Sequence, residues 1–109
     1  MAYDEKLAER LYKIFITVPH VDERKMFGGL VIMVNGNLCC GIIKDKLVVR
    51  VGKEKYPELL KHKHAQEMLF TGRPMRGVLN IKPKGIKTKK QLEYWVEQGL
   101  SFVQTLPEK

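Results

Sequence analysis

Two adjacent cysteines, Cys39 and Cys40, are the best nucleophiles in the sequence. A catalytic or redox thiol needs a nearby base or a positive environment that lowers its pKa. The candidate bases are His20, His62 and His64, and sequence position places none of them beside a cysteine. Neighbouring strand residues point to opposite faces, so we expect at most one of the two thiols in the core and the other at the surface. A thiol-dependent enzyme using Cys39 or Cys40 is an alternative to two small, well-packed strand residues.

Metal and phosphate sites have characteristic spacings that this sequence does not match. Structural zinc sites use Cys-x₂₋₄-Cys or His-x₃₋₅-His, whereas Cys39 and Cys40 are adjacent and His62 and His64 lie two positions apart. The adjacent glycines at 28–29 have neither P-loop nor dinucleotide-binding spacing, and they lead into an apolar run. We therefore expect no metal and no cofactor, and interpret the glycines as a bulge or sharp bend where another segment packs closely.

Basic residues provide the strongest binding feature. Five lysines fall within nine residues, at Lys82, Lys84, Lys87, Lys89 and Lys90. The last two begin a predicted helix, where positive charge opposes the helix dipole, so local stability does not explain them. Such a cluster can contact nucleic-acid phosphates without sequence preference, and its alternative is a solvated, flexible loop. A second candidate surface, for an anion or a protein partner, consists of Arg50, Arg73, Met75 and Arg76.

Composition and charge limit the class of protein. The 109 residues carry a formal net charge of +8, and the excess lies entirely in residues 44–109, with fifteen basic and seven acidic side chains. That length fits one domain, which we expect to span residues 1–109. There is no secretory signal pattern and no apolar run long enough to cross a bilayer. We expect a cytoplasmic protein with reduced cysteines and no membrane partner.

Helical periodicity appears in three segments. Residues 4–18 predict an amphipathic helix capped by Asp4, and residues 53–62 predict a short helix. The last helix begins at the capping-box pattern Thr88-Lys89-Lys90-Gln91 and includes Trp95 on its apolar face. Gly99 lies on the same face, which predicts close approach by another backbone.

Strand patterns fill the middle of the chain. Apolar runs at 26–34 and 38–43 flank Asn35-Gly36, a hairpin-turn signal, and further strands are predicted at 47–51 and 78–81. Residues 20–24 are interpreted as a polar connector and residues 70–77 as a structured loop. The predicted fold is α+β: an antiparallel sheet of about four strands, with the N- and C-terminal helices packed on it and a short crossover helix.

Five ordered segments resemble one family. They are MFGG, VNGNLCCG, LVVRVG, FTGRPMRG and LEYWVEQGLSFVQTLP, and together they are similar to the N-terminal domain of the TfoX/Sxy family, which includes regulators of bacterial natural competence. The resemblance covers residues 3–107 and implies an α+β domain, here standing alone without the helical C-terminal domain of the competence regulators. It supplies no catalytic, metal or cofactor residues. The motif residues are Phe27, Gly28, Gly29, Asn35, Gly36, Gly72, Pro74, Trp95 and Gly99.

The resemblance favours a non-enzymatic regulatory module that acts in transcription through a protein partner. Weakly specific nucleic-acid binding through residues 82–90 is the main alternative. Adaptable methionines could contribute to a partner surface, although most methionines fill cores; they are Met26, Met33, Met68 and Met75. The edges of the sheet leave homodimerisation by strand pairing open as well.

Overall fold

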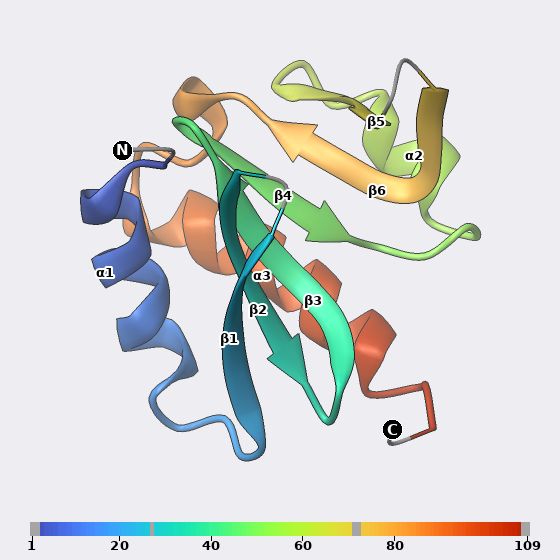
Figure 1. The fold of residues 1–109 in the computed structure, drawn as a ribbon. Helices are drawn as coiled ribbons and strands as arrows, with labels where there is room; N and C mark the ends of the chain where they lie inside the picture. Colours follow the sequence, from blue (N-terminus) through green and yellow to red (C-terminus); the bar gives the residue numbers. More distant parts are fainter. Residues whose placement is uncertain (1–2, 27, 71–72, 108–109) are drawn as a thin grey trace.

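A six-stranded antiparallel sheet forms the centre of the computed structural model, which describes residues 3–26, 28–70 and 73–107 (Figure 1). The strand order across the sheet is β1-β2-β3-β4-β6-β5, so β1 and β5 are the edges. The strands are β1 (Val21–Met26), β2 (Gly29–Val34), β3 (Asn37–Ile43), β4 (Lys46–Arg50), β5 (Ala65–Phe70) and β6 (Arg73–Ile81). The helices are α1 (Glu5–Phe15), α2 (Tyr56–Leu60), the 3₁₀ turn η1 (Pro83–Gly85) and α3 (Lys89–Val103).

The main core lies between the sheet and the two long helices. Leu11 of α1 and Trp95 of α3 are buried in the same cluster as Leu47 and Val49 of β4. Alternation along β4 turns Val48 to the opposite face, where a smaller cluster also contains Met68 and Val78. Helix α2 contacts β5 and β6. The sheet is thus apolar on both faces, and α3 lies against β3 and β4.

The predicted starts of the two long helices are confirmed by their caps, whereas the first helix ends at Phe15 and not at residue 18. The Asp4 carboxylate accepts hydrogen bonds from the backbone N–H groups of Lys6 and Leu7, at 2.9 and 3.3 Å. At α3 the Thr88 hydroxyl accepts from the Gln91 N–H at 3.1 Å, and the Gln91 side chain accepts from the Thr88 N–H at 3.0 Å. These bonds pair N–H groups that the first turn of a helix leaves unsatisfied.

The α+β class and the terminal helices were predicted correctly, but the sheet has six strands and not about four. Residues 21–24 of the predicted connector at 20–24 belong to β1, which pairs with β2 from Val21–Val34 to Met26–Gly29. Its charged side chains are exposed, as suits an edge strand. The predicted loop at 70–77 belongs to the β5–β6 hairpin, in which Phe70 pairs with Arg73.

The glycine predictions are confirmed where the chain is described. Asn35 and Gly36 have φ of 53° and 79°, the paired positive angles of a tight hairpin turn. Gly28 (φ 73°) lies in the β1–β2 turn, and a Cβ on Gly29 would collide with the Ile42 carbonyl. A Cβ on Gly99 would lie 3.0 Å from the Cys39 carbonyl oxygen. Phe27 and Gly72 lie outside the described residues.

Among the helices of the described residues, none has the length and apolar character needed to cross a bilayer.

Candidate functional site

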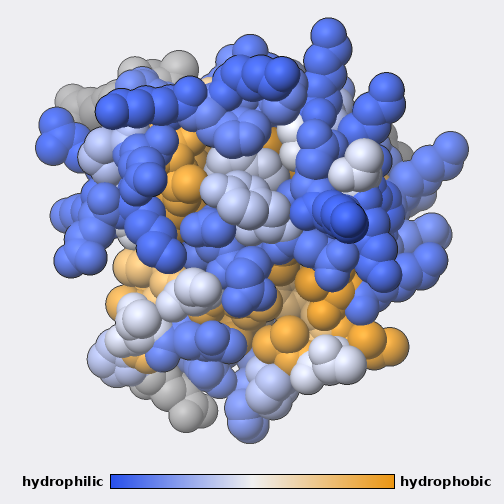
Figure 2. Space-filling model, turned by 180° about the vertical axis from the view of Figure 1, so that it is seen from behind, coloured by the Kyte–Doolittle hydropathy of each residue, from blue (hydrophilic) through white to orange (hydrophobic). Residues whose placement is uncertain are grey.

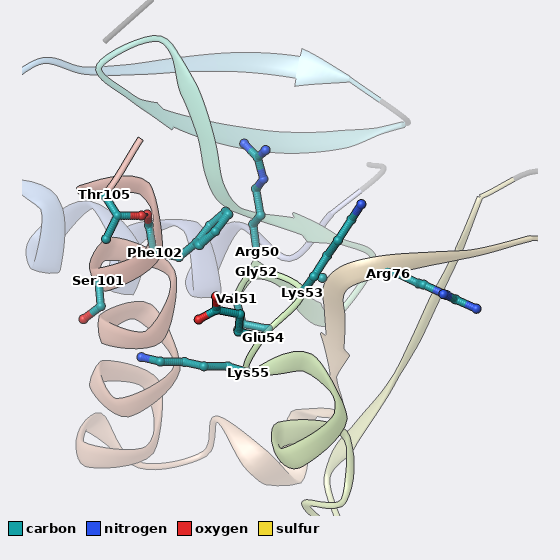
Figure 3. A pocket seen from close by; sticks show the side chains of 11 residues that line it. Arg50, Val51, Gly52, Lys53, Glu54, Lys55, Arg76, Ser101, Phe102 and Thr105 are labelled. Carbon is teal, nitrogen blue, oxygen red and sulfur yellow. The ribbon is translucent and has the colours of Figure 1, made fainter. Parts of the chain in front are cut away.

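A cleft of about 600 Å³ opens where the end of β4, the β4–α2 connection, β6 and the end of α3 meet (Figure 3). Two glycines bring these elements together: the Val51 and Gly52 N–H groups both donate to the Gly77 carbonyl, at 2.8 and 3.1 Å. Gly52 and Gly77 have φ of 86° and 91°, and a Cβ on Gly52 would lie 2.5 Å from the Phe102 ring. Only glycine fits such a position, so the backbone sets the floor of this cleft.

Four basic side chains line the Arg50 cleft, as we name it: Arg50, Lys53, Lys55 and Arg76. Glu54 is the one carboxylate among the lining residues. The Arg50 guanidinium carbon lies 5.2 Å from the centre of the Phe102 ring, a cation–π distance that leaves its N–H groups available. In Figure 3, Arg50 and Lys53 point to the same side, Lys55 extends toward α3 and Arg76 points away from the others. The cleft therefore carries a net positive charge at its rim.

The structure brings together two of the four residues predicted for a partner or anion surface, Arg50 and Arg76. The side chains of Arg73, Pro74 and Met75 lie outside the described residues, as does that of Met26. Met33 is half-buried and Met68 is buried, so Met68 offers no partner surface. Lys53 and Lys55 were not predicted, although two lysines directly after a buried strand could have suggested them.

The five predicted lysines lie on an ordered connection and not on a flexible loop. All five are exposed, and residues 82–90 are named here the lysine segment. The Lys82 N–H donates to the His64 carbonyl at 2.9 Å, and the Gly85 N–H donates to the Lys82 carbonyl at 2.8 Å. Ile86, which is 3% exposed, anchors the segment in the main core. The lysine backbones are thereby held in fixed positions while their side chains remain in solvent.

Arg10 of α1 also fixes this segment, and sequence reasoning missed it. Its Nη2 donates to the Ile86 carbonyl at 2.6 Å, with longer contacts to the carbonyls of Thr88 at 3.3 Å and Lys87 at 3.4 Å. The contact joins residues 76 positions apart, so no local pattern could have revealed it. Arg10 connects α1 to the start of α3.

Both cysteines are completely buried, which corrects the prediction that one would reach the surface. Strand β3 has an irregular register: Cys40 pairs with Ile32 and Leu38 with Met33, which leaves Cys39 without a partner on β2. This bulge turns two consecutive side chains to the helix-covered face. A hydrogen bond with Cys39 and burial raise the pKa of the Cys40 thiol. Neither thiol is accessible, so the fold gives no support to a thiol enzyme.

His62 and His64 pack against aromatic rings. His62 and His64 follow α2, with ring centres 5.7 Å apart, and the His62 ring meets Trp95 edge-on at 5.0 Å. Within 3–26, 28–70 and 73–107, His, Cys, Asp and Glu side chains form no group of three or more that could hold a metal ion.

A comparison with models of protein families identifies the family of this chain. The model of the TfoX N-terminal domain matches residues 13–103. This chain belongs to the TfoX N-terminal domain family. The matched range includes the sheet, α2, α3 and both basic surfaces, whereas most of the Arg10-bearing helix α1 lies before it. Comparisons with curated proteins and with solved structures found no match.

Proposed function

We propose that this TfoX-family domain is a non-enzymatic module that acts in transcription regulation by binding a protein partner, and that the partner presents an acidic segment to the Arg50 cleft. The observation that carries the proposal is the charge of the cleft, where four basic side chains accompany one carboxylate. Arginine recognises carboxylates through paired N–H donors, which gives orientation as well as attraction.

The size of the cleft and its aromatic wall favour a peptide ligand over a small ion. A volume of about 600 Å³ lies within the range of small-molecule and peptide pockets, and the Phe102 ring supplies an apolar wall beside Arg50. Aromatic and arginine side chains are enriched at protein interfaces, because they combine large contact area with specific polar contacts. An acidic segment with one apolar side chain fits this combination.

The chemistry of the lining residues argues against catalysis in the cleft. It contains no histidine and no cysteine, and its one carboxylate stands among lysines. The Thr105 hydroxyl already donates to the Phe102 carbonyl at 2.6 Å. The other hydroxyl is that of Ser101, and no hydrogen bond joins it to a base among the described residues that line the cleft. The nucleophile–base pair that covalent catalysis requires is therefore not formed there.

Sheet-edge homodimerisation stays a prediction, and β1 disfavours it at one edge. Asp22, Glu23, Arg24 and Lys25 are all exposed there. Charged side chains on an edge strand oppose pairing with a second sheet. Sedimentation equilibrium across a range of protein concentrations would measure the oligomeric state directly.

The experiment is an NMR titration with an acetylated glutamate-rich decapeptide that contains one leucine. We expect shifts at the amides of residues 50–55, 76–77 and 101–105, and loss of these shifts in Arg50→Glu/Arg76→Glu. The matched control, Lys13→Glu/Arg24→Glu, changes the net charge equally at exposed sites on α1 and β1. Equal weakening in the two variants, or shifts spread over all basic surfaces, would contradict a specific role for the cleft.

A further inference from the structure

The lysine segment carries charge that the folded protein does not use for its own stability. The one ion pair in the described parts of the chain joins Arg24 to Asp22, so none of the five lysines has a paired carboxylate there. Lys89 and Lys90 stand in the first turn of α3, which contains no acidic residue. Positive charge at this end of a helix is unfavourable. Lys89 and Lys90 therefore have a cost in the free protein that an external anion would offset.

Further positive charge converges on the same place. Partial burial and the positive charges of Lys63, Lys82 and Lys84 lower the pKa of His64. Lys63 precedes β5, so it adds a basic side chain from outside the lysine segment. Figure 2 views the molecule from the side on which α3 lies, and hydrophilic side chains cover most of its upper half. Because five exposed lysines fall within nine residues, a polyanion would meet several of them at once.

A hollow of about 300 Å³ lies directly beside the segment. Its lining residues are His62, Gly85, Lys90, Gln91, Tyr94 and Trp95. Tyr94 is 45% exposed, and its ring meets Trp95 at right angles, with centres 5.1 Å apart. Trp95 is buried and also contacts His62, so the exposed ring has a rigid base. An exposed aromatic ring beside an exposed lysine is the arrangement on which nucleic-acid bases stack.

We propose that the lysine segment and this hollow bind single-stranded nucleic acid, with the lysines on successive phosphates and one base stacked on Tyr94. A single strand fits better than a duplex because only an unpaired base can leave its neighbours and enter the hollow. The site lies at the start of α3, whereas the Arg50 cleft lies at its end. The inference is thus independent of the proposed function.

The number of lysines sets the expected salt dependence. Five phosphate contacts on a single strand give a slope of log K against log salt of roughly −3.5. Between about 50 and 200 mM salt, affinity should then fall by roughly 100-fold. Loss of one stacked base should weaken binding by about 5- to 150-fold, largely without changing this slope.

The test is fluorescence anisotropy with fluorescein-labelled oligo(dT) and oligo(U) of about 20 nucleotides, and a DNA duplex of equal length. Lys84→Glu/Lys87→Glu/Lys90→Glu should abolish single-strand binding at the lower salt concentration. Lys6→Glu/Lys13→Glu/Lys25→Glu is the matched control: its three sites are also exposed, and both triple variants lower the formal net charge from +8 to +2. If the two triple variants lost equal single-strand affinity, binding would depend only on the net charge of the protein, and the proposal would be overturned.

Tyr94→Leu tests the hollow, with Tyr12→Leu as its control, because Tyr12 is similarly exposed, at 42%, on α1. We expect weaker binding only for Tyr94→Leu, with an unchanged salt slope. The proposal is overturned if Tyr94→Leu binds like the parent protein, if the duplex binds as tightly as the single strands, or if no single strand binds at the lower salt concentration. Arg50→Glu/Arg76→Glu should bind single strands as tightly as the charge-matched variant Lys13→Glu/Arg24→Glu. Loss of peptide binding at the Arg50 cleft can therefore be distinguished from loss of single-strand binding at the lysine segment.

Discussion

Replacing Arg10 by methionine should destabilise the protein through one long-range contact. The substitution keeps an apolar stem of similar length but removes the guanidinium, and with it the 2.6 Å bond to the Ile86 carbonyl. Hydrogen bonds from charged donors contribute about 1.5–3 kcal/mol. Arg10 is half-buried and its contacts to Lys87 and Thr88 are long, so the low end applies. We expect a loss of about 1.5 kcal/mol in the free energy of unfolding, or roughly 6 °C in Tm.

Urea denaturation followed by circular dichroism would measure this loss. Arg24→Met is the matched control, because it also removes one positive charge. Arg24 faces Asp22 at 3.5 Å, but both side chains are more than 60% exposed. Exposed ion pairs contribute little, so we expect a change below about 0.5 kcal/mol. If the two variants were equally stable, the Arg10 contact would not fix the lysine segment, whose order would then rest on the Lys82–His64 hydrogen bond and the burial of Ile86 alone.

Two further predictions concern thiols and pH. Cys39 and Cys40 are both fully buried, so their reaction with Ellman's reagent requires opening of the core. We expect the folded protein to be labelled at least about 1,000-fold more slowly than free cysteine. A labelling rate equal to that of free cysteine would refute the buried bulge. Because the pKa of His64 is lowered in the folded state, the unfolded chain takes up the proton first, and stability should decrease as pH falls below about 6.5. His64→Gln should reduce this decrease in urea denaturation at pH 7.5 and 5.5, and an identical decrease in both proteins would contradict the shift.

Local chemistry made part of the fold predictable. The capping box at Thr88 and the Asn35-Gly36 turn are formed by side chains and backbone angles within a few residues, so their patterns were sufficient. The strand β1 was missed because its exposed charges resemble those of a connector, and only pairing with β2 makes it a strand. Local propensity contains no information about that partner.

The candidate sites also differ in whether the local sequence could reveal them. The lysine segment could be found from composition, because its five lysines are close in sequence. The bulge at Cys39 could not, since it arises from the register between two strands and reverses the alternation rule at one residue. The Arg50 cleft joins the β4–α2 connection to the end of α3, about fifty residues later. Tyr94 could not be predicted as a site residue, because the hollow beside it is formed by residues from different parts of the chain.

Helix α3 separates the two basic surfaces. From the first turn at Lys89 to Phe102 the axis rises by about 20 Å, at roughly 1.5 Å per residue. The two proposed binding surfaces share no residue, and a rigid helix would hold ligands at its two ends at a constant distance. Such an arrangement raises the effective concentration of one partner near the other without any contact between them. If both surfaces bind as proposed, this protein would act as an adaptor, and its longest helix would set the spacing between the two partners.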